Sequence, residues 1–502
     1  MKIILSTLNA RYTHSAIGLR YLYANMQELQ NSTSILEFSI NDGIQSVAEK
    51  ILDEKPDIIG LGVYIWNASQ TYELIEILKK VSTETTIVLG GPEVSYQPFR
   101  VDFSKADYIL QGEGDTSFYK LCKKIISHEA PSEQIISPVI EDLSRIMLPY
   151  AFYTQNDIDN RYIYVEASRG CPFMCEFCLS SIDEKVRNFD LDSLLCEFEA
   201  LWQKGARNFK FVDRTFNLNM RFANALLDFF LSKEPPYFAH FEVIPDHFPE
   251  ILKSKIALFP EGALQLEIGI QTLNPDIANN INRPLKLEKI RENIAFIEQQ
   301  TKAHVHLDLI VGLPGESIES FGRNLNELVA LSSSEIQIGI LKKLSGTTLE
   351  RHDTVFGMRY SDLPPYDILC NDLLSFKQIQ KMKRFSRFWD LLYNSGNFKH
   401  TIALLWKEES VFDSFYAFSE WIYAQTDATW KISLERLSLL LFTYLTQEKK
   451  QEAQAVSKPM LKDLMTLQGR VVPSFLRPFA EENIKNKNKR GSSLNKRQAQ
   501  RA

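Results

Sequence analysis

The spacing of hydrophobic and polar positions divides the chain into segments of different type. Between residues 162 and 341, short apolar runs typical of buried strands alternate with amphipathic runs typical of helices. Strands that alternate with helices build a parallel sheet, and eight such units close a barrel. The six strand-like runs predict an open, partial (β/α)6 barrel over residues 155–365. The predicted strands are Tyr162–Ala167, Asn208–Val212, Phe238–Val243, Leu264–Ile270, His304–Val311 and Glu335–Leu341, and the predicted helices are Arg221–Lys233, Leu287–Gln299 and Ser317–Leu331.

A second α/β unit is predicted ahead of the barrel, over residues 1–140. Its short buried strands end in glycine-bearing turns, and Ser69–Val81 has the pattern of an amphipathic helix. We expect a doubly wound, Rossmann-like domain, which binds ligands at the carboxyl ends of its strands. A polar, proline-broken linker, Ser127–Asp159, is predicted to follow it. The predicted strands are Ile3–Leu5, Ile58–Val63, Thr86–Leu89 and Ala106–Leu110.

The pattern changes again beyond the barrel, to helices rich in aromatic residues. Phe376, Phe385 and Trp389 recur close to helical spacing, which predicts an α-helical C-terminal domain over residues 366–483. We expect it to pack on the open side of the barrel, and it is a candidate wall for the substrate pocket. Residues 484–502 are basic and almost free of apolar side chains, which is typical of a disordered tail.

Composition agrees with several globular domains and excludes some classes. A chain of 502 residues with 44% hydrophobic content can bury two or three cores, and its net charge of −6 argues against a nucleic-acid partner. No apolar run reaches the roughly 18 residues that span a bilayer. The first residues lack the basic cluster and long apolar core of a signal peptide, so we expect a cytoplasmic protein without disulfides.

Three cysteines in the run ASRGCPFMCEFCLSS are the main candidates for chemistry: Cys171, Cys175 and Cys178. Three thiolates from one loop hold three irons of a [4Fe-4S] cluster and leave the fourth iron free to bind another molecule. A zinc site is the alternative, but it needs a fourth ligand close by, and the next histidine is His240. The remaining cysteines lie in apolar, helix-like stretches and are predicted core residues: Cys122, Cys196 and Cys370.

The CxxxCxxC spacing, with Phe177 before the last cysteine, resembles the signature of the radical S-adenosylmethionine superfamily. The resemblance implies that the amino and carboxylate groups of S-adenosylmethionine chelate the open iron. Reduction then cleaves the sulfonium to methionine and a 5'-deoxyadenosyl radical. Polar residues and a glycine at the strand ends resemble the family's S-adenosylmethionine pocket: Asp213, Glu242, Glu267, Gln271, Arg283, Asp308 and Gly312.

The resemblance gives these residues different roles. Carboxylates and the amide are expected to bind the ribose hydroxyls or the methionine ammonium, and Arg283 to pair with the carboxylate. Gly312, in the run GLPGE, lets the backbone approach the adenine. Considered one at a time, Glu242 and Asp308 could instead cap helices or pair with nearby basic side chains.

The glycine turns of the first domain resemble those of a cobalamin-binding domain. No G-x-G-x-x-G string follows the first strand, which disfavours a nicotinamide cofactor. In the resembling domains, G-G-P and G-E-G turns approach the corrin face and the nucleotide tail. Here these positions are Gly90, Gly91, Pro92, Gly112, Glu113 and Gly114.

One departure from that family concerns the lower axial ligand of cobalt. The string D-x-H-x-x-G, which supplies a histidine, is absent, and His14 is the histidine nearest to a strand end. His14 is either that ligand or an ordinary surface or helix-capping residue. We expect cobalamin without histidine ligation, with its lower face covered by Tyr64, Trp66 or Asn67. Methylthiotransferases share the barrel but need three further cysteines for a second cluster, and residues 1–150 contain only Cys122.

The order of domains resembles the cobalamin-dependent radical S-adenosylmethionine enzymes, in particular a bacterial subgroup with a helical C-terminal domain. The resemblance implies radical C-methylation of a small-molecule or peptide substrate, with electrons from a donor such as flavodoxin or ferredoxin. The alternatives are a cobalamin-assisted radical rearrangement or redox reaction without methyl transfer, and a non-catalytic sensor that binds a cluster and a corrin. The sequence does not identify the substrate.

Overall fold

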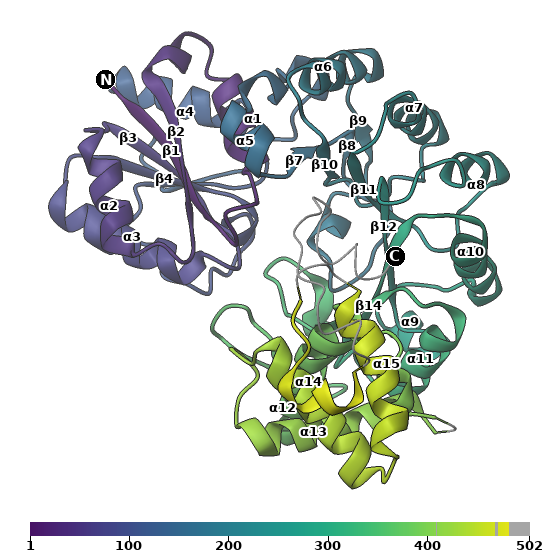
Figure 1. Ribbon diagram of the computed structural model, residues 1–502. Coiled ribbons are helices and arrows are strands. Elements are labelled where there is room, and N and C mark those ends of the chain that lie inside the picture. Colours follow the sequence, from purple (N-terminus) through teal and green to yellow (C-terminus); the bar gives the residue numbers. More distant parts are fainter. Residues whose placement is uncertain (408, 467–469, 481–502) are drawn as a thin grey trace.

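The computed structural model describes residues 1–407, 409–466 and 470–480, and it has two α/β units followed by a helical region (Figure 1). The first unit is a six-stranded parallel sheet of order β2-β1-β3-β4-β5-β6. The strands are β1 (Ile3–Asn9), β2 (Thr33–Ser39), β3 (Ile58–Gly62), β4 (Thr86–Gly90), β5 (Tyr108–Leu110) and β6 (Ile135–Ile136). The helices are α1 (Ile17–Ala24), α2 (Ile44–Asp53), α3 (Ala68–Val81) and α4 (Ser117–Ile126).

Helices cover both faces of this sheet, as the doubly wound prediction requires. Apolar residues of α2 and α3, such as Ile51 and Leu78, form one core with one face of the strands. Residues of α1 and α4, such as Leu19 and Phe118, form a second core on the other face. The central strands β1, β3 and β4 are therefore buried from two sides, which explains their largely apolar sequences.

Two strands, β2 and β6, and four α-helices of this part, α1, α2, α4 and α5 (Gln155–Asn160), were not predicted. β2 lies at the sheet edge with most of its residues half-buried, so its sequence, TSILEFS, lacks a continuous apolar run. β6 and α5 lie inside residues 127–159, the segment predicted as a linker. The prediction that this whole segment lacks regular structure is therefore wrong. Ile135 pairs with Ile109 of β5, and a capping box formed by Thr154 and Asp157 starts α5.

The second unit is the predicted open barrel. Its six strands are parallel in the order β14-β13-β12-β11-β10-β7, and within the described residues no pairing joins β7 to β14. The strands are β7 (Ile163–Val165), β10 (Asn208–Phe211), β11 (Phe238–Val243), β12 (Leu264–Gln271), β13 (His304–Val311) and β14 (Glu335–Ile340). The helices around it are α6 (Leu191–Gln203), α7 (Met220–Leu231), α8 (Glu250–Ile256), α9 (Pro275–Asn280), α10 (Leu287–Gln300) and α11 (Ile318–Leu331). The prediction of six strands is confirmed, while α6, α8 and α9 were not foreseen.

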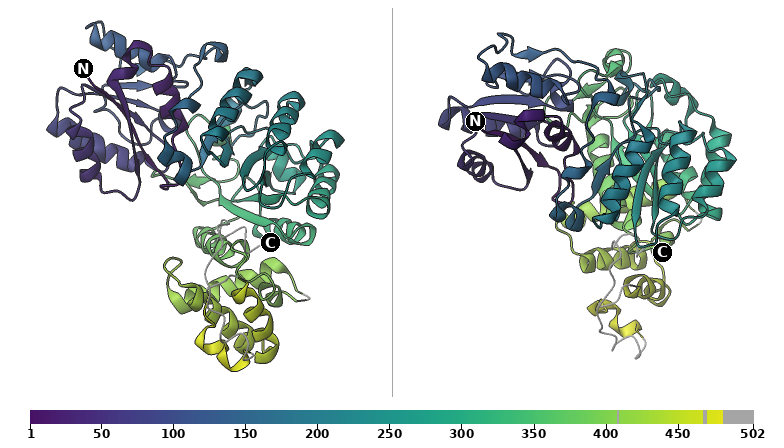
Figure 2. Two further views of the ribbon diagram at one scale, coloured as in Figure 1. Left: turned by 45° about the horizontal axis from the view of Figure 1, so that its top comes forward. Right: turned by 90° about the horizontal axis from the view of Figure 1, so that it is seen from above.

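The helical region packs against the last strand of the barrel and against α11, and most of it lies below the barrel in Figure 1. Figure 2 shows it from two further sides, and at its start Tyr366 Oη donates to Glu93 of the first unit. The side chain of Asn394 donates to Ile336 O (2.9 Å) and accepts from Ile336 N (3.0 Å), which occupies part of the free edge of β14. The prediction of helices packed on the open side is confirmed. The elements are β15 (Arg359–Tyr360), β16 (Ile368–Cys370), α12 (Phe376–Trp389), α13 (Val411–Thr426), α14 (Leu434–Thr443) and α15 (Ala453–Met465).

Three smaller expectations have different outcomes. Cys122 is a buried core residue as predicted, but Cys196 is exposed on α6 and Cys370 is half-buried at the end of β16, because the apolar faces of these elements point elsewhere. The predicted basic tail, 484–502, lies outside the described residues. Within the described ranges, no helix combines the length and apolar character needed to cross a membrane.

Candidate functional site

The loop that carries the three cysteines leaves the carboxyl end of the barrel between two short strands. β8 (Ser168–Arg169) and β9 (Arg187–Asn188) pair antiparallel and close the base of the loop. Gly170 has a φ of 89°, and a Cβ there would lie 2.5 Å from Lys185 O, so the turn into the loop requires glycine. Cys171 N–H donates to Asp183 O (2.8 Å), which fixes the first cysteine.

The positions of the sulfur atoms fit a cluster better than a single ion. A zinc ion with bonds of about 2.3 Å would draw three thiolates to within about 4 Å of one another. Among the described residues, the groups whose ligand atoms all lie within 4.8 Å do not include the three cysteines. Arg283 Nη1 lies 3.3 Å from Cys175 Sγ, and burial raises the pKa of Cys171. Sulfurs held apart beside a cation fit the larger, anionic cluster.

The cysteines line a cavity of about 510 Å³, within the range of cofactor pockets. The described residues around it all lie between Cys171 and Asp308, so the helical C-terminal region, expected as a candidate wall, does not line it. Its apolar lining includes Phe173, Phe177 and Leu285. The predicted S-adenosylmethionine residues that share the cavity with the cysteines are Phe177, Glu242, Glu267, Gln271, Arg283 and Asp308.

The carboxylates of this cavity differ in their electrostatic surroundings. Burial acts to raise the pKa of Glu267, but a hydrogen bond from His240 Nε2 (2.8 Å) and nearby positive charges outweigh it and lower the pKa. Burial and the charges of Glu267 and Glu242 raise the pKa of Asp308. Asp308 Oδ1 is buried without a hydrogen-bond partner among the described residues. A buried polar atom without a partner beside an open cavity suits a ligand hydroxyl or ammonium.

Two residues predicted for the S-adenosylmethionine pocket, Asp213 and Gly312, do not line this cavity. Asp213 accepts hydrogen bonds from Ala167 N (2.9 Å) and Ser168 Oγ (2.6 Å), so its carboxylate holds the start of the cysteine loop. Gly312 has a φ of 89°, and a Cβ there would lie 2.8 Å from Ile368 Cγ2. The close approach that glycine permits is therefore to β16.

Several residues near the cysteines were missed from the sequence. Arg214 lines the cavity and donates to Glu242 (2.7 Å), and its place directly after Asp213 at a strand end was a usable signal. Glu176, inside the cysteine motif, is buried and bonded to His352 Nε2 (2.6 Å) and to Arg351. These partners lie some 175 residues away in sequence, so no local pattern connects them.

The glycine turns predicted to hold cobalamin lie at the carboxyl ends of β4 and β5. Gly91 has a φ of 109°, and a Cβ there would lie 2.6 Å from Val63 O, whereas the nearest atom to a Cβ on Gly90 is 4.0 Å away. Gly91 therefore makes the turn, and Gly90 leaves its backbone open to a flat ligand. Pro92 starts a short 3₁₀ turn. Gly112 packs on Pro138, and Gly114 packs on Leu22.

The residues predicted to cover the lower face of cobalamin differ in how exposed their side chains are and in how firmly hydrogen bonds hold them. Asn67 is fully buried and donates to Thr7, Leu8 and Gly62, so its side chain holds the strand ends together instead of facing a ligand. Trp66 is 42% exposed and stacks on Tyr64 with 4.5 Å between ring centroids. His14 Nδ1 lies 2.5 Å from Tyr164 Oη of the barrel. Trp66 and Tyr64 thus offer an accessible aromatic surface at the end of β3.

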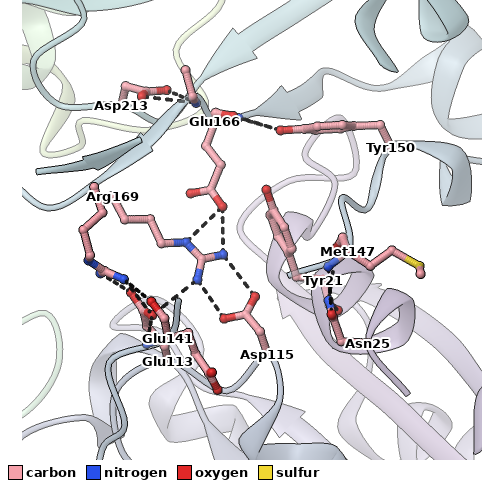
Figure 3. A network of polar contacts seen from close by, with 12 residues as sticks. Tyr21, Asn25, Glu113, Asp115, Glu141, Met147, Tyr150, Glu166, Arg169 and Asp213 are labelled. Carbon is pink, nitrogen blue, oxygen red and sulfur yellow. Dashed lines mark hydrogen bonds and ion pairs between the residues drawn. The ribbon is translucent and has the colours of Figure 1, made fainter. Parts of the chain in front are cut away.

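A network of buried charges joins these turns to the cysteine loop (Figure 3). Arg169 donates to both oxygens of Asp115 (2.7 and 3.0 Å) and to Glu166 (2.9 Å), and Arg187 donates to Glu113 (2.5 Å). Glu113, predicted to contact the nucleotide tail, is thus also an interdomain ion-pair partner. The ligand-binding edge of the first sheet therefore faces the cysteine loop.

Comparison with known families divides the chain in the same way. Residues 3–121 match the B12 binding domain, and residues 165–328 match the radical SAM superfamily. Residues 354–501 match a protein family of unknown function, DUF4080. The first two matches imply a [4Fe-4S] cluster, S-adenosylmethionine and cobalamin as cofactors.

The names of individual relatives of this chain refer to methyl transfer, to radical S-adenosylmethionine chemistry with cobalamin, or to both. An uncharacterized methyltransferase of Pyrococcus horikoshii is 24% identical over 67% of this chain and 78% of its own length. The cobalamin-dependent radical SAM methyltransferase TokK of Streptomyces tokunonensis is 22% identical over 63% of this chain. The match spans about half (51%) of the length of TokK. The structure of the cobalamin-dependent S-adenosylmethionine radical enzyme OxsB, with aqua-cobalamin and S-adenosylmethionine bound, has a TM-score of 0.60 at 12% identity, covering 92% of this chain and 79% of OxsB. The last comparison shows a shared fold.

Proposed function

We propose that this chain, a radical S-adenosylmethionine protein with an N-terminal cobalamin-binding domain, transfers a methyl group to an unactivated carbon of a small-molecule or peptide substrate. The observation that carries the proposal is the buried charge network between the glycine turns and the cysteine loop. It joins the edges that would hold the two cofactors. When bound, the cofactors supply a carbon-centred radical from S-adenosylmethionine and a transferable methyl group from cobalamin.

The cavity beside the cysteines supplies groups of the right chemistry for S-adenosylmethionine. Arg283, anchored on Gly269 O and lying against Cys175, is placed to pair with the carboxylate of the bound molecule. Asp308 and Glu242 are placed to accept hydrogen bonds from an ammonium or from ribose hydroxyls. Phe173, Phe177 and Leu285 exclude water, which protects a reactive radical.

The first domain is expected to hold the corrin at the ends of β3, β4 and β5. Gly90 leaves the backbone open there, and Trp66 with Tyr64 offers an aromatic surface. We favour cobalamin without a histidine ligand, because the string D-x-H-x-x-G that supplies one is absent. His14 Nδ1 is bonded to Tyr164, which leaves its Nε2 as the alternative ligand.

An anaerobic labelling experiment tests this proposal before the substrate is known. The full chain, reconstituted with iron, sulfide and hydroxocobalamin, receives methyl-labelled S-adenosylmethionine and electrons from flavodoxin or ferredoxin. We expect the label on the corrin and 5'-deoxyadenosine in solution. Cys175→Ala should abolish 5'-deoxyadenosine, because it removes a cluster ligand.

The same experiment separates a second candidate, radical chemistry with cobalamin but without methyl transfer. This candidate is supported by the fold shared with OxsB, a cobalamin-dependent S-adenosylmethionine radical enzyme. Formation of 5'-deoxyadenosine with an unlabelled corrin would support it. A full cluster and bound corrin without 5'-deoxyadenosine under strong reduction would instead indicate a non-catalytic sensor.

A further inference from the structure

Two histidines and a glutamate converge at the end of the barrel opposite the cysteine loop. His304 and His306 belong to the first half of β13, and Glu335 is the first residue of β14. The strands are parallel, and Glu335 pairs in register with His306. These residues therefore lie at the amino ends of the strands, whereas the cofactor cavity lies at the carboxyl ends.

The three side chains meet through atoms that ligate metals. His304 Nε2 lies 3.1 Å from His306 Nε2 and 3.1 Å from Glu335 Oε1. His306 Nε2 lies 3.5 Å from Glu335 Oε2, and one ligand atom from each residue falls within 4.8 Å of the other two. With bonds of about 2.05 Å, the ligand atoms of a zinc ion would be about 2.9 Å apart in octahedral and about 3.3 Å apart in tetrahedral geometry. The observed separations of 3.1 to 3.5 Å bracket the tetrahedral value and exceed the octahedral one.

Neighbouring side chains set the tautomer of His306. Its Nδ1 lies 2.5 Å from Gln337 Nε2 and 3.3 Å from Gln265 Nε2, so these amide nitrogens donate to Nδ1 and the ring hydrogen lies on Nε2. Metal binding through Nε2 requires the Gln337 amide to turn, so that its oxygen accepts a hydrogen from Nδ1.

We propose that His304, His306 and Glu335 bind one zinc ion, with water in the remaining position. Imidazole nitrogens together with a carboxylate suit zinc better than calcium or magnesium, which prefer oxygen ligands. The ion would tie β13 to the edge strand β14 and stabilise the amino end of the barrel, where His306 pairs in register with Glu267 of the cofactor cavity. This inference is independent of methyl transfer.

Zinc binding to the full chain tests the site. The protein is first loaded with its iron–sulfur cluster, which occupies the three cysteines, and is then titrated with Zn²⁺ against a competing chelator. We expect about one zinc ion per chain and a higher melting temperature with zinc, since an ion that binds only the folded state stabilises it. His304→Asn and His306→Asn should each weaken binding at least about 100-fold, and Gln337→Ala about 10- to 100-fold. His128→Asn, at an exposed histidine, should bind zinc like the parent protein.

X-ray absorption at the zinc edge decides the case even if the variants fold poorly. Nitrogen and oxygen neighbours without sulfur are expected in the parent protein. Sulfur neighbours would place the zinc on cysteines and overturn the proposal. It is equally overturned if the parent protein holds no stoichiometric zinc, or if folded His304→Asn and His306→Asn bind zinc unchanged.

Discussion

Replacing Arg169 should strongly destabilise the protein, because its guanidinium compensates two buried carboxylates at once. The side chain is 15% exposed, and those of Asp115 and Glu166 are 6% and 10% exposed. Arg169→Ala leaves both acids without this partner and also removes a cation over the Tyr21 ring, 4.9 Å from its centroid. Removing one member of a buried ion pair costs about 3–5 kcal/mol, to which a lost cation–π contact adds about 0.5–1 kcal/mol. We therefore expect a loss of about 4 kcal/mol.

Guanidinium unfolding of the full chain, followed by tryptophan fluorescence, measures this loss. Arg169→Lys keeps the charge but lacks the planar fork, so its loss should fall between those of the parent and Arg169→Ala. Arg145→Ala is the matched control, because its ion pair with Asp142 (3.5 Å) is exposed and worth at most about 1 kcal/mol.

A double-variant cycle identifies the partner. Arg169→Ala and Asp115→Ala should not be additive, with a coupling energy of about 0.5–3 kcal/mol between them. The reasoning is refuted if Arg169→Ala costs less than about 1 kcal/mol, or no more than Arg145→Ala.

Three further predictions concern the loops and the start of the cysteine motif. Gly91→Ala should reduce corrin binding, measured by absorbance titration, and cost about 1–3 kcal/mol of stability, because its Cβ would lie 2.6 Å from Val63 O. Gly90→Ala is the control and should be tolerated better, since the nearest atom to its Cβ would be 4.0 Å away. Equal effects of the two substitutions would contradict this account. Glu176→Ala should lower the amount of iron bound after reconstitution, because it removes the bonds that hold the cysteine loop to His352 and Arg351. Glu184→Ala, at an exposed position of the same loop, should leave the iron content unchanged. Equal iron contents of the two variants would show that the bonds of Glu176 do not support the cluster. Burial raises the pKa of Asp213 to about 7, against the hydrogen bonds from Ser168 and Ala167 that act to lower it. The folded state then holds a proton that the unfolded state has released, so unfolding free energy should fall as pH rises from about 4 to 7, by at most about 1.4 kcal/mol per pH unit, and Asp213→Asn should flatten this part of the pH profile.

The sequence predicted best what depends on local pattern. β11 and β13 begin and end at the predicted residues, because apolar residues recur along each of them and polar segments bound it on both sides. The cysteine spacing and the motif around Glu267 are also local patterns, and they identified most of the predicted residues that line the cavity. Glu176 with His352, and Arg169 with Asp115, depend on contacts between distant segments, and no single-sequence pattern encodes those. The bond of Asp213 to the backbone of the cysteine loop was also not predicted, because a strand-end carboxylate can bind the chain's own backbone as readily as a ligand.

The barrel interior shows a pattern that sequence reasoning could have used further. Along β13, Val305, Leu307 and Leu309 are buried, while His304, His306 and Asp308 alternate with them and remain half-buried. Strict alternation is unusual for a strand of a parallel sheet, whose two faces are normally both apolar. It indicates that one face of this strand lines a polar interior. One strand thus supplies Asp308 to the cofactor cavity at its carboxyl end and two zinc-ligand candidates at its amino end. A single period-two pattern therefore links the expected reaction site to the proposed structural ion, and substitutions at alternate positions of β13 should divide between them.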